Sequence, residues 1–342
     1  MNNYVMLDYY NKFRCKTGEC RQACCQGWTV SITLNEYFKI VNLDCDEKFR
    51  EKLDRGFYIN LRPENDHYAT IRKNYYGDCV FHGCDGLCEI HKNFGEKAIP
   101  SVCNFYPRNI SKEYALEKSC SNSCEKVLEL LFENTNPLQF VYEKTNDEVV
   151  NYLDEYNICR KRIINTLQNR ELPLQERLNK ISLQELGIEF DITKTKKSEE
   201  IINTLLDYLK LYVDQSSVAL DFIELINDSD IINYDNYLKH LYEVIPNFDI
   251  YLEKYIVNHV FFTGFPYDKL IGKYDYFIHS LVGVYMLTKI ITVFMMKSST
   301  KECDAVDAIA KLYRLIGHSN FHKNIGKYLY KTDKDTILQM VK

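Results

Sequence analysis

The cysteines of this 342-residue chain are its most reactive feature, and eleven of the thirteen lie before residue 125. Four of them, Cys15, Cys20, Cys24 and Cys25, stand in the segment FRCKTGECRQACCQGW (13–28). Thiolates are ligands of zinc and of iron–sulfur clusters, and four of them complete a tetrahedral shell or hold a [4Fe–4S] cube. Because the intervening loops are short, several sulfur atoms can meet at one centre. The spacing therefore predicts a metal or iron–sulfur site.

A second group of cysteines follows in DCVFHGCDGLCEIHKNFGEKAIPSVCNFYPR (78–108). Asp85-Gly86 is typical of a tight turn, so we expect Cys79 and Cys88 on opposite arms of a hairpin-like loop. The segment after Cys88 is expected to form a short helix that ends at Gly95, and the segment after Pro100 a turn or helix that carries Cys103.

The spacing leaves alternatives open. It differs from zinc ribbons, which need two CxxC pairs, and from the CxxxCxxC of radical S-adenosylmethionine enzymes. Some of these cysteines, Cys45 and Cys84 above all, are equally well explained as inert buried residues. A disulfide framework is the weaker alternative, because thirteen is an odd number and no secretory leader precedes the cysteines.

Composition narrows the class of protein. Apolar residues at 46% and charged residues at 27% are typical of a globular protein, and the net charge of −5 provides no basic surface for nucleic acid. The N-terminus has no apolar run, so we expect a cytoplasmic protein with reduced thiols. The segment 277–296 is long enough to span a membrane, but Lys289 and His279 interrupt it; we expect a buried core helix and no membrane span.

The elements expected before residue 133, which must position most of the cysteines, are short. The elements expected after it are helices. The sequence predicts a mainly α fold with two regions, a cysteine-rich region at 1–133 with short strands and loops, and an all-helical region at 134–342. The best linker candidate is 189–197. Expected elements are a helix within 30–43 capped by Thr33 or Asn35, strands near 62–63, 68–72 and 111–118, and helices at 120–132, 138–168, 173–183, 198–227, 234–244, 248–262, 267–296, 304–316 and 319–340.

The cysteine segments also resemble a known family. FRCKTGECRQACCQGW is similar to the start of the bacterial flagellin lysine N-methylases and of the related CxxCxxCC zinc- or iron-chelating domain proteins. The resemblance continues through the segment 78–108 and Ser119-Cys120, and then through KYIVNHVFFTGFP and RLIGHSNFH near the end of the chain. It covers most of the chain, and the order of the cysteines is specific.

The resemblance implies a cytoplasmic enzyme that transfers a methyl group from S-adenosylmethionine to lysines of flagellin, with a [4Fe–4S] cluster. The cysteines that match the family pattern are Cys15, Cys20, Cys24, Cys25, Cys79, Cys88, Cys103 and Cys120. Tyr106-Pro107-Arg108 matches its YPR motif, and Arg108 is a candidate to bind a carboxylate of the cofactor or a structural carboxylate. Cys84 is additional, and His91 stands where glutamine is expected. The alternative is a non-catalytic zinc- or iron-binding protein.

Overall fold

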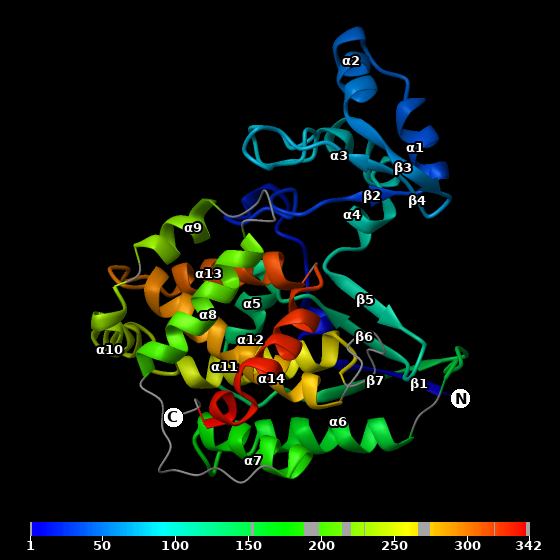
Figure 1. The fold of residues 1–342 in the computed structure, drawn as a ribbon. Helices are drawn as coiled ribbons and strands as arrows, with labels where there is room; N and C mark the ends of the chain where they lie inside the picture. Colours follow the sequence, from blue (N-terminus) through cyan, green and yellow to red (C-terminus); the bar gives the residue numbers. More distant parts are fainter. Residues whose placement is uncertain are drawn as a thin grey trace. The chain divides into compact units, whose positions relative to one another are not determined.

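The computed structural model describes residues 2–151, 154–187, 198–213, 220–228, 230–265, 274–317 and 319–339. The fold is mainly helical, as predicted, with helices α1 to α14 in the described ranges (Figure 1). The chain forms two compact units. Unit 2 comprises Arg14–Pro107, and unit 1 comprises Met1–Phe13 together with Arg108–Lys342. The expected division at 133/134 therefore differs from the observed one.

Unit 2 consists of short elements joined by the cysteine loops. A three-stranded antiparallel sheet has the order β2-β4-β3. Its elements are η2 (Thr17–Glu19), β2 (Ser31–Ile32), α1 (Leu34–Val41), α2 (Glu47–Arg55), β3 (Phe57–Glu64), β4 (His67–Ile71), α3 (Glu89–Phe94), η3 (Glu96–Ala98) and α4 (Ser101–Phe105).

Local sequence signals explain the helices of unit 2. Thr33 caps α1, because its side chain accepts a hydrogen bond from the Glu36 backbone N–H while the Glu36 carboxylate accepts one from the Thr33 N–H. Gly95 ends α3 at a φ of 80°, a conformation that side chains with a Cβ rarely adopt. Both ends confirm the sequence predictions. A small core, which includes Ile32, Leu53 and Phe81, holds these elements together.

Unit 1 contains a mixed four-stranded sheet of order β5-β6-β1-β7, with strands β1 (Asn2–Leu7), β5 (Arg108–Ser111), β6 (Glu117–Cys120) and β7 (Phe140–Thr145). Strand β1 runs parallel to β6 and antiparallel to β7. The N-terminal strand therefore lies between two strands from beyond residue 107. This pairing explains why the first residues join unit 1 and not the cysteine loops that follow them.

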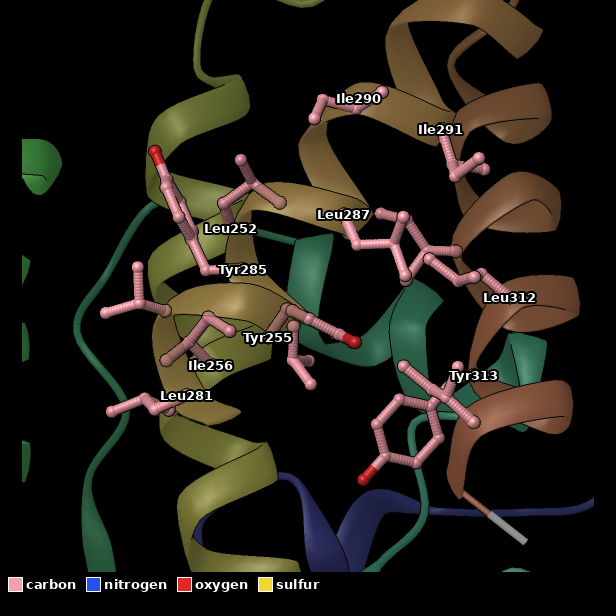
Figure 2. Packing of buried hydrophobic residues seen from close by; sticks show 14 of the residues in the cluster. Leu252, Tyr255, Ile256, Leu281, Tyr285, Leu287, Ile290, Ile291, Leu312 and Tyr313 are labelled. Carbon is pink, nitrogen blue, oxygen red and sulfur yellow. The ribbon is translucent and has the colours of Figure 1, made fainter. Parts of the chain in front are cut away.

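The helices of unit 1 enclose a large apolar core. They are α5 (Glu125–Phe132), α6 (Asp154–Leu167), α7 (Leu174–Leu186), α8 (Ser198–Val213), α9 (Leu220–Asn227), α10 (Tyr234–Val244), α11 (Phe248–Phe262), α12 (Tyr274–Met295), α13 (Glu302–Gly317) and α14 (Phe321–Gln339), with short 3-10 turns η1 (Tyr10–Lys12) and η4 (Ile231–Asn233). In Figure 2, Tyr255 of α11, Leu287 of α12 and Leu312 of α13 meet in this core.

A buried ion-pair group also stabilises unit 1. Glu253 of α11 is fully buried, and its carboxylate accepts hydrogen bonds from two guanidinium groups. Arg170 Nη2 lies 2.8 Å from Glu253 Oε1, and Arg177 Nη1 lies 2.6 Å from Glu253 Oε2. A buried carboxylate needs such partners because it has lost its hydration.

Three sequence predictions were wrong in part. The strand expected at 111–118 falls mostly on the connection between β5, which ends at Ser111, and β6, which begins at Glu117. The helix expected at 120–132 begins only at Glu125, since Cys120 ends β6 and the residues between them form a turn. The helix expected at 138–168 contains β7, whose aromatic and β-branched residues pair along β1, before α6 begins at Asp154. The linker predicted at 189–197 lies outside the described residues.

The long apolar helix is a core helix. In the described part of the chain, α12 is the one helix long and apolar enough to cross a membrane. Its window Tyr276–Met295 is 94% buried inside the protein, which fits the predicted buried helix.

Candidate metal centre

The two cysteine segments of unit 2 meet through their backbones. The Cys79 N–H donates a hydrogen bond to the Cys25 carbonyl oxygen at 2.8 Å, and Gln26 forms an antiparallel bridge with Asp78. At the predicted turn, Gly86 adopts a φ of 77°, and a Cβ there would lie 2.8 Å from the Gly18 carbonyl oxygen. Only glycine allows this turn and its close approach to the first segment.

Trp28 contacts both the first cysteine loop and the small core of unit 2. The Trp28 indole N–H donates a hydrogen bond to the Cys24 carbonyl oxygen at 2.6 Å. The Trp28 and Tyr106 rings are in contact, with centroids 5.6 Å apart. Trp28 also packs against the core that includes Ile32 and Phe81. It therefore joins the Cys24 loop and the tyrosine of the YPR motif to that core.

The Cys24 thiol lies within electrostatic reach of four other thiols of unit 2, those of Cys25, Cys79, Cys88 and Cys103. A hydrogen bond with Cys24 raises the pKa of Cys25, and burial adds to this. Burial raises the pKa of Cys79 to about 11, and the neighbouring Cys88 and Cys24 raise it too. Burial likewise raises the pKa of Cys88 and of Cys103, again with a contribution from Cys24.

These shifts have one chemical consequence. Buried thiols that repel each other as anions stay protonated at neutral pH unless a cation balances them. A bound metal ion supplies that charge and binds the thiolate form. Thiolates are the ligand type of a thiophilic metal or an iron–sulfur cluster, and binding of one here stays a prediction. Among the residues described, however, no three His, Cys, Asp or Glu side chains are arranged to hold a metal ion.

The other cysteines of unit 2 have different surroundings. Cys15 is exposed, and its Sγ accepts a hydrogen bond from the Thr17 N–H at 3.3 Å. Cys20 is half-buried. Neither is among the main causes that shift the pKa values of Cys25, Cys79, Cys88 and Cys103. Cys45 packs against the small core and Cys84 is exposed. All thirteen cysteines lie in described residues, and none forms a disulfide.

Cys120 belongs to unit 1. It ends β6 and pairs in register with Arg108 of β5. Burial raises the pKa of Cys120 well above its ordinary value, and the Arg108 guanidinium opposes that rise. The same guanidinium lies 4.8 Å from the centre of the Phe13 ring. Whether Cys120 and the other seven cysteines bind one metal centre, and whether Arg108 binds a cofactor, stay predictions.

A buried polar network surrounds Cys120. Its backbone N–H donates to the Tyr9 hydroxyl at 3.2 Å, and that hydroxyl donates to Asn258 Oδ1 at 2.6 Å. The Asn258 amide donates in turn to the Cys120 carbonyl oxygen and to Asn122 Oδ1. Asn258 belongs to KYIVNHVFFTGFP, one of the segments that resemble the family. This segment thus contacts the strand that carries Cys120. Sequence reasoning missed Asn258 and Asn122, because a single asparagine in a helix carries no pattern.

A second polar feature of unit 1 is a cavity of about 20 Å³, lined by His259, Thr263, Phe265, Phe277, Ser280, Leu281 and His322. His259 Nδ1 is hydrogen-bonded to the Tyr313 hydroxyl at 2.7 Å. Burial, with the nearby His322, lowers the pKa of His259 to about 3. The cavity has room for one water molecule. His318 stands four residues before His322, a spacing that would place two imidazoles on one helical face, but His318 lies outside the described residues.

Comparison with known proteins gives a limited likeness. The chain is 26% identical over 124 residues to a Lysine-N-methylase of Salmonella typhimurium, a match that covers 35% of this chain and 30% of that protein. The same identity and coverage relate it to a Lysine-N-methylase of Salmonella choleraesuis. It is 25% identical to the Flagellar biosynthetic protein FliU of Salmonella muenchen over 35% of this chain and 70% of that protein.

The match spans less than a third of the length of the two lysine-N-methylases. No family model and no solved structure matches the chain. The names of the three relatives agree with the family that the cysteine segments resemble. These relatives therefore support the resemblance of this chain to the bacterial flagellin lysine N-methylases.

Proposed function

We propose that this chain is a protein-lysine N-methyltransferase that uses S-adenosylmethionine and acts on flagellin. The observation that carries the proposal is its similarity to proteins named Lysine-N-methylase and to a flagellar biosynthetic protein. The five-thiol group of unit 2 adds support, because the resemblance implies an iron–sulfur enzyme and these thiols are suitable ligands.

The proposed cofactor is a [4Fe–4S] cluster, with ligands drawn from Cys24, Cys25, Cys79, Cys88 and Cys103. When bound, such a cluster supplies an iron that can hold the amino and carboxylate groups of S-adenosylmethionine. The Trp28 indole N–H fixes the backbone of the Cys24 loop through its hydrogen bond to the Cys24 carbonyl oxygen.

The acceptor lysine must lose its proton before methyl transfer, since an ammonium group has no lone pair. An unperturbed lysine has a pKa of about 10.4, so the enzyme must desolvate it or offer a proton acceptor. Arg108 is a candidate to bind a carboxylate, because its guanidinium is half-buried and planar and offers paired donors. Its alternative role is to fix β5 beside Phe13.

Mass spectrometry of flagellin coexpressed with this protein tests the proposal. Wild type is expected to yield methylated lysines, and Cys24→Ala is expected to abolish them. Cys303→Ala is a matched control, because this half-buried cysteine lies in α13 of unit 1, and methylation should persist. Unmethylated flagellin with the wild type would remove the enzymatic proposal.

A non-catalytic zinc- or iron-binding protein is the second candidate. The thiol group favours it as much as it favours the enzyme, because thiols hold a structural zinc equally well. The two candidates differ in metal content. An anaerobically purified brown protein with iron and sulfide supports the enzyme, whereas a colourless protein with stoichiometric zinc and no effect on flagellin supports the alternative.

A further inference from the structure

We propose that an open pocket of unit 2 binds the nucleoside half of S-adenosylmethionine, which is an uncharged purine nucleoside. The inference rests on the proposed function, and it concerns the half of the molecule that a cluster iron would not hold. It assigns a binding role to α2 and to the loop before Cys79, which neither the cysteine pattern nor the resemblance singled out.

The first observation is the size and position of the pocket. Its volume is about 760 Å³, and small-molecule sites usually have volumes of about 300–1,000 Å³. Most of its lining residues belong to α2 or to the N-cap of that helix. Val80 and Glu89 also line it, and they directly follow Cys79 and Cys88. The pocket wall is therefore built in part from the segment that carries the second group of cysteines.

The second observation is the balance of charge in the pocket. Three basic and three acidic side chains line it, namely Lys48, Lys52, Arg55, Asp46, Glu51 and Glu89. The Lys52 ammonium lies 2.5 Å from the Glu89 carboxylate. Arg55 Nη1 likewise lies 3.0 Å from Glu51 Oε1. The pocket thus has no surplus of positive charge for a phosphate group, and an uncharged nucleoside suits it better than a nucleotide.

The N-terminus of α2 is also unsuited to a phosphate. Helix N-termini bind anions through backbone N–H groups that have no partner within the helix. Here the Asp46 carboxylate accepts a hydrogen bond from the Phe49 N–H at 2.8 Å, so an acidic side chain of the protein already caps the helix. A phosphate at this end of the pocket would be repelled by Asp46.

The third observation is an apolar wall that suits a purine base. Phe49 and Val80 provide this part of the lining. The Phe49 ring packs against the Phe94 ring, with centroids 5.4 Å apart, and Phe49 is half-buried. Packing therefore holds the Phe49 side chain while part of it stays accessible from the pocket. Stacking on an aromatic side chain is a contact that every base can make.

Asn74 provides a hydrogen-bond donor at the pocket. Its Oδ1 accepts hydrogen bonds from the Tyr76 and Asp78 backbone N–H groups at 2.9 and 3.0 Å, which fixes the orientation of the amide. Among the described residues, no group accepts a hydrogen bond from its Nδ2. Because Asn74 lines the pocket, this donor is available to a ligand there. The ring nitrogens of adenine are acceptors, and ribose hydroxyls can donate to the carboxylates of the pocket.

Isothermal titration calorimetry of the anaerobic full chain with adenosine, S-adenosylhomocysteine and AMP tests the inference. Wild type is expected to bind adenosine and S-adenosylhomocysteine. It should bind AMP more weakly than adenosine, because the phosphate meets no surplus of positive charge. Absence of adenosine binding, or tighter binding of AMP than of adenosine, would overturn the inference.

Glu51→Trp should block the pocket. Glu51 is exposed on α2 and lines the pocket, so an indole at this position is expected to fill the space and to abolish adenosine binding. Asp54→Trp is the matched control, since Asp54 is an exposed acid of the same helix that does not line the pocket. This control should bind adenosine like wild type. Equal affinities for the two tryptophan variants contradict the inference.

Phe49→Leu tests the stacking contact without filling the pocket. It is expected to weaken adenosine binding at least about fivefold. Phe94→Leu loses the same ring contact outside the pocket and should leave the affinity unchanged. Photolabelling of wild type with 8-azidoadenosine covers the case in which variants fail to fold. The label should appear in peptides that contain α2 or Asn74, and label confined to unit 1 refutes the pocket.

A failure of this inference can be distinguished from a failure of the proposed function. If purified Glu51→Trp methylates flagellin with an unchanged KM for S-adenosylmethionine, the pocket assignment is wrong and the methyltransferase proposal stands. If wild type binds adenosine in the pocket but leaves flagellin unmethylated, the binding site stands and the methyltransferase proposal is wrong.

Discussion

The two units of this protein differ in what holds them together. Unit 1 has a large apolar core in which α11 and α12 are buried on nearly all sides, and a fully buried carboxylate paired with two arginines. Unit 2 has a core of nine buried apolar side chains, short elements and a group of largely buried thiols. A unit with so small a core has little packing to stabilise it. If the proposed metal binds there, we expect unit 2 to depend on it, whereas unit 1 depends on packing.

Removal of the proposed metal should have the largest effect, and it should destabilise unit 2 while leaving unit 1 unchanged. Chelation of the anaerobic protein is expected to unfold unit 2, because the binding free energy of the metal contributes directly to folding. Hydrogen exchange measured by mass spectrometry should show at least about hundredfold loss of protection in β3 and β4, and no change in α11. Unchanged protection in unit 2 would contradict the account.

Loss of the buried carboxylate should have the largest effect on unit 1. Glu253→Gln leaves Arg170 and Arg177 without a counter-charge, and breaking a buried ion pair in this way costs about 3–5 kcal/mol. Thermal or denaturant unfolding measures the loss. Glu143→Gln is the control, since the Glu143 carboxylate is half exposed in its pair with Lys118 and is expected to contribute little. Similar losses in the two variants would show that burial is not the cause.

Acid should destabilise unit 1 through His259. The unfolded chain binds a proton at this side chain near pH 6.5, whereas burial lowers the folded pKa to about 3. The contribution of His259 is therefore present above pH 6.5 and is lost as pH falls from there towards 3. Between pH 6.5 and pH 5 the loss is about 2 kcal/mol. His259→Gln should remove this slope from denaturant unfolding curves measured across that range; an unchanged slope would assign it to other groups.

The smallest effect is expected for Thr33→Ala, which tests how large the free energy of unfolding of unit 2 is. Thr33→Ala removes the capping box of α1 and should cost about 1 kcal/mol. Because unit 2 lacks a large core, this change should raise the exchange rates of its amides more than the same loss would in unit 1. Thr33→Ser keeps the oxygen acceptor and should behave like wild type. If Thr33→Ala also leaves exchange unchanged, unit 2 has more stability than its core implies.

The sequence predicted the elements that follow from local chemistry. Thr33 as a cap, Gly95 as a helix end and 248–262 as a helix depend on neighbouring residues or on periodicity, and the structure confirms them. The meeting of the two cysteine segments was expected from ligand chemistry, and the turn at Gly86 explains it.

The sequence did not predict what long-range pairing decides. Residues 140–145 have a pattern compatible with a helix, but β1, far away in the sequence, pairs with them as a strand. The same strand draws the N-terminus into unit 1. Such features depend on tertiary contacts and not on local sequence.

Native mass spectrometry of the anaerobically purified full chain tests the central claim, that the thiols of unit 2 hold an iron–sulfur cluster. The account predicts that wild type carries the added mass of four iron and four sulfide, and that Cys24→Ala/Cys103→Ala loses it while Cys303→Ala keeps it. Wild-type protein with zinc, or with no added mass, would contradict the cluster.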